Sequence, residues 1–129
     1  MTTTVVTAGE RQAAERAAGL AIWRGPVTPQ RLAGGITNIN FVIEDSGERY
    51  VVRIGDDIPV HQILRFNEEA ASRAAFAAGI SPEVIHTEPG VLVMRYIAGK
   101  TLTADDMRDP ARLARVVPLL KRVHRDMPR

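Results

Sequence analysis

The spacing of apolar residues along the chain predicts a helix followed by three strands. Residues 10–23 are rich in alanine, glutamate and arginine with apolar positions near helical spacing, and the Gly-Pro pair at 25–26 ends this helix. Strand-like runs follow at 30–33, 39–44 and 49–54, with a tight Asp-Ser-Gly-Glu turn between the last two. Because short connections favour neighbouring antiparallel strands, we expect these three strands to form a meander.

The second half of the chain predicts another helix, followed by two strands. An alanine-rich segment at 60–78 predicts a helix that stops at Gly79. Strands at 83–87 and 91–97 follow, joined by a Glu-Pro-Gly turn at 88–90. The predicted fold class is therefore α+β, with an antiparallel five-stranded sheet, one packed helix, and flanking N- and C-terminal helices.

A last helix is predicted from Asp109 to the end of the chain. Asp109 is a favourable N-cap, Pro110 suits the first turn, and Pro118 should kink the helix because proline lacks an amide proton. One side of this helix is apolar and carries Leu113, Val116, Val117, Leu120, Val123, His124 and Met127. If nothing covers this face, it would favour a homodimer.

Composition narrows the class of protein. The 129 residues are 45% hydrophobic and 25% charged, which is ordinary for one soluble domain, and the absence of cysteine excludes disulfides and thiolate metal sites. No basic stretch precedes an apolar segment at the N-terminus, and no apolar run approaches the roughly 20 residues that span a bilayer. We therefore predict a cytoplasmic chain without a membrane partner.

Basic residues gather at the C-terminal end, although the net charge is only +2. Those in the segment 108–129 are Arg108, Arg112, Arg115, Lys121, Arg122, Arg125 and Arg129. They alternate with the apolar face, as is typical of the solvated side of an amphipathic helix, and contact with another domain is an alternative. Nucleic-acid binding would call for interleaved aromatic residues, which this segment lacks, so we predict no nucleic-acid partner.

The Gly-Gly-Ile-Thr-Asn segment at 34–38, between two predicted strands, has the composition of a phosphate-binding loop. Glycines let backbone N–H groups approach phosphate oxygens, and a cation nearby takes up their charge. Arg53 on the third predicted strand supplies such a cation. A Gly-Gly pair by itself is more often only a turn, so the interpretation depends on the combination.

Strand and helix periodicity together predict an ion pair for Arg53. Alternation along the third strand places Val51 and Arg53 on one face and Val52 on the other. On the following helix, Glu68 falls at the border of the apolar arc, whereas Glu69 falls in the middle of the polar face. We therefore predict that Arg53 pairs with Glu68, whereas Glu69 should lie near Arg73 on the polar face. The alternative is two independent surface charges.

Five segments form an ordered set along the chain: Gly34-Gly35-Ile36-Thr37-Asn38, Tyr50-Val51-Val52-Arg53-Ile54, Arg65-Phe66-Asn67-Glu68, Ala78-Gly79-Ile80-Ser81-Pro82 and Val93-Met94-Arg95-Tyr96-Ile97-Ala98-Gly99. In this order they resemble the N-terminal lobe of choline/ethanolamine kinases, within a kinase-like superfamily that includes the aminoglycoside phosphotransferases. Arginine at position 53, where most kinase-like enzymes use lysine, is typical of the choline kinase branch. The resemblance implies a nucleotide-binding, protein-kinase-like N-terminal lobe at 29–98. An N-terminal helix and connection at 1–28 would precede it, and an inter-lobe linker with the first helix of a C-terminal lobe would follow at 99–129.

The resemblance also implies an ATP site. The residues implied beside the phosphates are Gly34, Gly35, Thr37, Asn38, Arg53 and Glu68. The residues implied beside adenine are Val51, Met94, Arg95, Tyr96 and Ile97. Arg53 would hold phosphate oxygens with its guanidinium fork and would be oriented by Glu68. The segment 95–97 would be a hinge that offers backbone groups to adenine, although plain core packing is the alternative for Met94 and Tyr96.

The residues that would perform the chemistry are expected outside this chain. Kinases of this superfamily carry a His-x-Asp-x-x-x-x-Asn loop and a later metal-binding aspartate in the C-terminal lobe. The His-Arg-Asp sequence at 124–126 has no following asparagine, and His124 on the apolar face suits a core or lobe contact. Asp105, Asp106 and Asp109 suit helix capping. We therefore expect no catalytic or metal-binding residue here, and we expect the Mg²⁺ ligands beyond this chain.

These observations predict the ATP-binding half of a small-molecule kinase, which would transfer the γ-phosphate of ATP to an alcohol and be inactive without its second lobe. Its partners would be a nucleotide and, through the C-terminal lobe, a small alcohol. Choline or ethanolamine come first, followed by thiamine or an aminoglycoside. Two alternatives stay open: a free-standing module that binds a nucleotide or a protein partner, and a basic nucleic-acid binder, which steep salt dependence would reveal.

Overall fold

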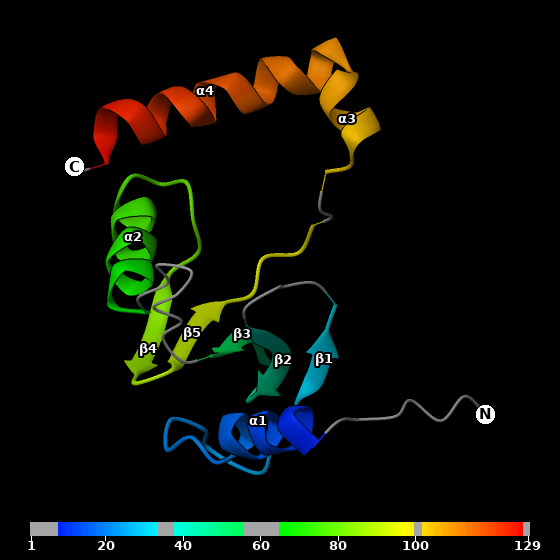
Figure 1. The fold of residues 1–129 in the computed structure, drawn as a ribbon, viewed down its shortest axis with the longest axis vertical. Helices are drawn as coiled ribbons and strands as arrows, with labels where there is room; N and C mark the ends of the chain where they lie inside the picture. Colours follow the sequence, from blue (N-terminus) through cyan, green and yellow to red (C-terminus); the bar gives the residue numbers. More distant parts are fainter. Residues whose placement is uncertain (1–7, 34–37, 56–64, 100–101, 128–129) are drawn as a thin grey trace.

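A computed structural model describes residues 8–33, 38–55, 65–99 and 102–127, and Figure 1 shows their arrangement. In chain order the elements are α1 (Ala8–Ala18), β1 (Gln30–Leu32), β2 (Ile39–Asp45), β3 (Glu48–Ile54), α2 (Arg65–Ala77), β4 (Val84–Glu88), β5 (Val91–Arg95), α3 (Ala104–Arg108) and α4 (Pro110–Asp126). The five strands form one antiparallel sheet in the order β1-β2-β3-β5-β4. The predicted α+β class and the predicted meander are confirmed.

The hairpin between β2 and β3 is set by its turn. Ser46 and Gly47 have φ values of 53° and 81°, and Asp45 pairs with Glu48 across the two-residue loop. Two successive residues with positive φ define a type I′ turn, whose twist matches that of the flanking strands. The turn therefore fixes the register that brings Asn40 opposite Arg53 farther along the hairpin.

Replacing Gly47 with alanine is expected to lower the free energy of unfolding by about 1 kcal/mol, because a Cβ is strained in the left-handed region. A Cβ built at Gly47 meets nothing within 4 Å, so strain rather than a clash would cause the loss. Gly25→Ala is the matched control, since Gly25 also has open space and no positive φ. Urea unfolding of the two variants measures the difference, and equal free energies would contradict the turn assignment.

The core lies between α1 and one face of the sheet (Figure 1). Strand alternation sends alternate side chains to this face: Phe41, Ile43, Val52, Ile54, Val91 and Val93. The helix contributes Ala13 and Ala17, whose small side chains let its backbone approach the strands. Full burial of one Val or Ile side chain contributes about 1.5–3 kcal/mol, so this face supplies much of the apolar stabilisation.

The first helix ends earlier than predicted, at Ala18 rather than at residue 23. The indole Nε1 of Trp23 donates to the carbonyl oxygen of Ala17 at 2.8 Å, and Gly19 N–H donates to Glu15 at 2.9 Å. The chain thus folds back and Trp23 satisfies a carbonyl of the last turn, which helical continuation would otherwise have used. Its ring also packs on Tyr50, with centroids 5.5 Å apart.

Helix α2 lies on the other side of the sheet from α1 (Figure 1). The predicted start at residues 60–64 lies outside the described residues, whereas the predicted stop at Gly79 is confirmed. Gly79 has φ 77°, its N–H donates to Phe76 at 2.9 Å, and the N–H of Ile80 donates to Ala75 at 3.0 Å. These two bonds form a Schellman motif, which needs a residue with positive φ after the helix.

Two C-terminal features differ from prediction. The last strand ends at Arg95 rather than at residue 97, and a short helix, α3, was missed. Thr103 and Asp106 form a capping box at the start of α3, and Asp109 accepts from Ala111 N–H at 3.0 Å at the start of α4. Capping, the predicted role of Asp106 and Asp109, is therefore confirmed.

Helix α4 continues through Pro118, and the kink there stays a prediction. Its apolar side chains are exposed in the described structure, with Leu120 at 54%. His124 is also exposed, so a core role for His124 within this chain is wrong. No helix in the described ranges has the length and apolar character needed to cross a membrane.

Candidate nucleotide site

Arg53 is held between two neighbours on the face of the sheet opposite α1. Its Nε donates to Oδ1 of Asn40 at 3.4 Å, and its Nη1 donates to Oε1 of Glu68. The side chains of Arg53 and Glu68 are 30% and 23% exposed, so the pair is partly shielded from solvent. The predicted ion pair is confirmed. Sequence reasoning missed Asn40, which the strand register alone places opposite Arg53.

Glu69 contacts Arg73, as its place on the polar face of the helix predicted, and it also contacts β4. Its Oε1 accepts a hydrogen bond from the Thr87 hydroxyl at 2.9 Å and another from Nε of Arg73 at 3.2 Å. These two contacts, Thr87 first, hold the pKa of Glu69 below its usual range because they stabilise the ionised carboxylate. Helix periodicity gave no sign of the Thr87 contact, because that contact depends on where β4 lies relative to α2.

A cavity of about 250 Å³ lies beside the Arg53–Glu68 pair. The residues that line it come from β3, α2 and the β4–β5 hairpin, and they include Arg53, Glu68, Phe66 and Leu92. The guanidinium therefore borders a space that a ligand can enter. The held orientation of Arg53 suits an anion, because Asn40 and Glu68 already fix two of its three nitrogens.

A second hollow, of about 390 Å³, brings together all the residues predicted beside adenine. Val51 on β3 and Met94 on β5 are register partners, and both line this hollow with Arg95, Tyr96 and Ile97. Leu32 on β1 also lines it, although the sequence had not singled it out. Met94 is mostly buried as well, so its core and pocket interpretations both hold. Val51 and Arg53 share a strand face, and each borders one of the two spaces.

The hinge segment is only partly available to a ligand. Arg95 N–H donates to the carbonyl of Glu83 at 2.9 Å, and Tyr96 N–H donates to the carbonyl of Arg49 at 3.1 Å. These two amide protons therefore serve the sheet and not a ligand. A side-chain contact also holds Tyr96 beside β3, because the Arg49 guanidinium lies 5.0 Å from the Tyr96 ring centroid.

The Arg95 side chain ties the end of β5 to two acidic residues. It contacts Glu48 at 2.8 Å and Glu83 at 3.2 Å. The hydrogen bond that Arg95 donates to Glu83, together with the attraction of the nearby carboxylates, raises the pKa of Arg95 above its usual value. The guanidinium is charged with or without this shift, so the effect of the two ion pairs is structural. They position the end of β5, where the predicted hinge segment 95–97 begins.

The glycine loop is largely outside the described residues. Gly34, Gly35 and Thr37 fall there, whereas Asn38 is described, half-buried, immediately before β2. Within the described ranges, no group of three histidine, aspartate or glutamate side chains could hold a metal ion. The arrangement can thus offer a largely apolar hollow and an oriented cation, but the described residues do not offer a metal site.

Comparison with known proteins finds a sequence match and a fold match. Protein LicA of Haemophilus influenzae is 32% identical over 94 residues, which make up 70% of this chain and 28% of that protein. An ethanolamine kinase of Plasmodium vivax matches with a TM-score of 0.68 at 21% identity, over 80% of this chain and 28% of its own. The fold match confirms the predicted fold class, a protein-kinase-like N-terminal lobe. This chain spans little more than a quarter of either relative, and no protein-family model matches the sequence.

Proposed function

We propose that this chain, which resembles the N-terminal lobe of the choline/ethanolamine kinase-like proteins, is the ATP-binding half of a small-molecule kinase. One observation carries the proposal: on a single face of the sheet, a hollow lined by Val51 and Met94 adjoins the strand position of an oriented Arg53. A largely apolar hollow beside a fixed cation suits the two ends of a nucleotide, since adenine is an apolar-faced base and the phosphates are anionic.

Adenine would lie in the hollow against the side chains of Leu32, Val51 and Met94, which share one face of the sheet. Since the N–H groups of Arg95 and Tyr96 are engaged, the hinge contacts would come from the Arg95 carbonyl and the Ile97 N–H. This assignment places the base at the point where the chain leaves β5. The position follows from the hydrogen bonds of the sheet and from the lining of the hollow.

The phosphates would extend from the hollow toward Arg53. Its guanidinium would hold phosphate oxygens while Glu68 and Asn40 keep the fork in place. The glycine loop would cover the phosphates through Gly34, Gly35, Thr37 and Asn38, with backbone N–H groups as donors.

Magnesium and the acceptor alcohol would be held by a second lobe. The described residues do not fit a magnesium site, because the nearest carboxylate to Arg53, that of Glu68, is already paired with it. When bound, magnesium would neutralise charge on the ATP phosphates, and its ligands are proposed to lie beyond this chain. Choline or ethanolamine is the proposed acceptor, in a cytoplasmic protein.

The division of the chain follows from the same proposal. Residues 1–28 would form the N-terminal helix and connection, 29–98 the nucleotide-binding lobe, and 99–129 the linker with the first helix of the second lobe. Exposed apolar side chains on α4, such as Leu120, support this division, because they need a cover that the described residues do not give. A free-standing binding module would instead show a polar α4 surface.

The proposal is tested by titrating the chain with ATP and with adenosine while recording its amide NMR spectrum. We expect ATP to shift resonances of Val51, Met94 and Ile97 and to bind about 100-fold more tightly than adenosine, because only ATP reaches Arg53. Shifts confined to the basic side of α4, with steep salt dependence, would favour the nucleic-acid alternative. No shifts with millimolar ATP would contradict the proposed function.

A further inference from the structure

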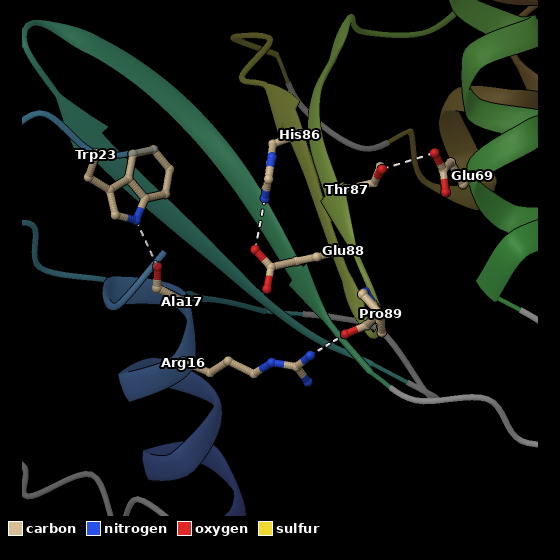
Figure 2. A network of polar contacts seen from close by, with 8 residues as sticks. All are labelled: Arg16, Ala17, Trp23, Glu69, His86, Thr87, Glu88 and Pro89. Carbon is tan, nitrogen blue, oxygen red and sulfur yellow. Dashed lines mark hydrogen bonds and ion pairs between the residues drawn. The ribbon is translucent and has the colours of Figure 1, made fainter. Parts of the chain in front are cut away.

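Two consecutive residues of α2 are fixed to the same cross-strand row of the sheet. The row consists of register partners on β2, β3, β5 and β4: Asn40, Arg53, Leu92 and Thr87. Glu68 receives a hydrogen bond from Arg53, and Glu69 receives one from the Thr87 hydroxyl. Figure 2 shows Thr87 on β4 directed toward Glu69 on α2. The helix is therefore attached to the third and the last strand of the sheet by adjacent side chains.

Two such contacts define the orientation of a helix, whereas a single contact lets it pivot. Neighbouring strands lie about 4.8 Å apart, so β3 and β4, with β5 between them, separate the contacts by about 10 Å. Adjacent helical residues point about 100° apart around the axis. Both contacts can therefore form together only within a narrow range of rotation of α2.

Apolar packing contributes little to this orientation. Among the α2 side chains that the structure describes, at 66–77, none is buried. Phe66 and Phe76 are 78% and 47% exposed. The direction in which Glu68 points therefore depends mainly on polar contacts of the helix. The Thr87–Glu69 hydrogen bond is a polar contact of α2 that does not involve Arg53 itself.

Thr87 is itself held firmly by the hairpin that carries it. Val91 and Val93 of β5 are part of the core beneath α1. At the tip of the hairpin, the Arg16 guanidinium donates to the carbonyl of Pro89, as Figure 2 shows. The β4–β5 hairpin is thereby fixed to α1 and the core, and the Thr87 hydroxyl is a fixed point for α2.

We propose that the Thr87–Glu69 hydrogen bond is a positioning contact that keeps Glu68 against Arg53 and so sets the orientation of the guanidinium. Thr87 and Glu69 touch no ligand in this scheme and act through Glu68. The consequence for nucleotide affinity rests on the proposed function. The consequence for the Arg53–Glu68 pair does not, because both side chains of that pair belong to this chain.

The test uses five variants of the full chain and the Nε–Hε NMR signal of Arg53. Thr87→Val removes the hydroxyl at similar volume, Thr87→Ser retains it, and Glu69→Ala removes the same hydrogen bond from α2. Arg73→Ala is the matched control, because Arg73 is the other partner of Glu69 and does not contact Thr87. Glu68→Gln supplies the reference signal for a broken Arg53–Glu68 pair.

We expect the Arg53 signal in Thr87→Val and in Glu69→Ala to move toward its position in Glu68→Gln. Thr87→Ser and Arg73→Ala should keep the wild-type signal. ATP affinity should fall about fivefold in Thr87→Val, because the Arg53 guanidinium loses its orientation. An unchanged Arg53 signal in folded Thr87→Val, or in Glu69→Ala if the first variant does not fold, would overturn the positioning role. Failure of the wild type to bind ATP would instead contradict the proposed function, and the Arg53 signal would still decide the role of Thr87.

Discussion

Replacing Arg53 with alanine is expected to weaken ATP binding about 100-fold while leaving adenosine binding nearly unchanged. Charge-assisted hydrogen bonds contribute about 1.5–3 kcal/mol each, and 1.4 kcal/mol corresponds to tenfold in affinity. Arg53 would supply such bonds only to the phosphates, because Val51 and Met94, not Arg53, line the hollow proposed for adenine. Calorimetric titration with both ligands separates these contributions.

The Arg53 experiment needs a control with the same change in net charge. Arg73→Ala provides it, since Arg73 lies on the exposed side of α2 with its side chain 52% exposed. Glu69→Ala would not serve as this control, because Glu69 contacts Thr87. Equal losses of ATP affinity in Arg53→Ala and Arg73→Ala would show a general charge effect and would contradict the assignment of Arg53 to the phosphates.

Lysine at position 53 should restore part of the affinity. An ammonium group retains the charge but lacks the planar fork, so it cannot contact Asn40 and Glu68 through separate nitrogens as Nε and Nη1 do. We therefore expect Arg53→Lys to lie between alanine and wild type. The difference in ATP affinity between Arg53→Lys and the wild type would measure how much the orientation of the guanidinium contributes. The Thr87–Glu69 contact is proposed to maintain this orientation.

Structural features that depend on residues close together in the sequence could be predicted. The turn at Gly47 and the helix stop at Gly79 were both foreseen, because a positive φ leaves a glycine signature in the chain. The Arg53–Glu68 pair is nonlocal but followed from two periodicities combined, one for the strand and one for the helix. The helix α3 also had a readable signal, since Thr103 and Asp106 have capping-box spacing, but its five residues were too short for a periodic pattern.

Features set by tertiary contacts could not be predicted. The end of α1 depends on the hydrogen bond that Trp23 donates to Ala17. The sequence concealed this end, because its apolar residues keep helical spacing beyond Ala18. The role of Glu69 depends on Thr87, and only the order of strands in the sheet places Thr87 beneath α2. In the same way, Asn40 became part of the site only through the β2–β3 register. The charged pair of the candidate site could thus be predicted, but the polar residues around it could not.

The second large effect is expected in the core, on the face of the sheet away from the site. Ile43 is fully buried beneath α1, so Ile43→Ala should lower the free energy of unfolding by about 3 kcal/mol through lost burial and a residual cavity. Val42→Ala is the matched control, because Val42 is the next residue on the same strand but lies half-buried on the opposite face. Its loss should stay below about 1 kcal/mol, which reflects mainly strand preference.

Urea unfolding followed by circular dichroism measures both variants, with a lower midpoint and an unchanged slope expected for Ile43→Ala. Equal losses for the two variants would mean that the faces of β2 are assigned incorrectly. Under conditions where Ile43→Ala is still folded, its ATP affinity should equal that of the wild type, since Ile43 and Arg53 lie on opposite faces of the sheet. This separation distinguishes loss of a phosphate contact at Arg53 from loss of the fold, because the first changes affinity without a comparable change in the unfolding midpoint and the second does the reverse.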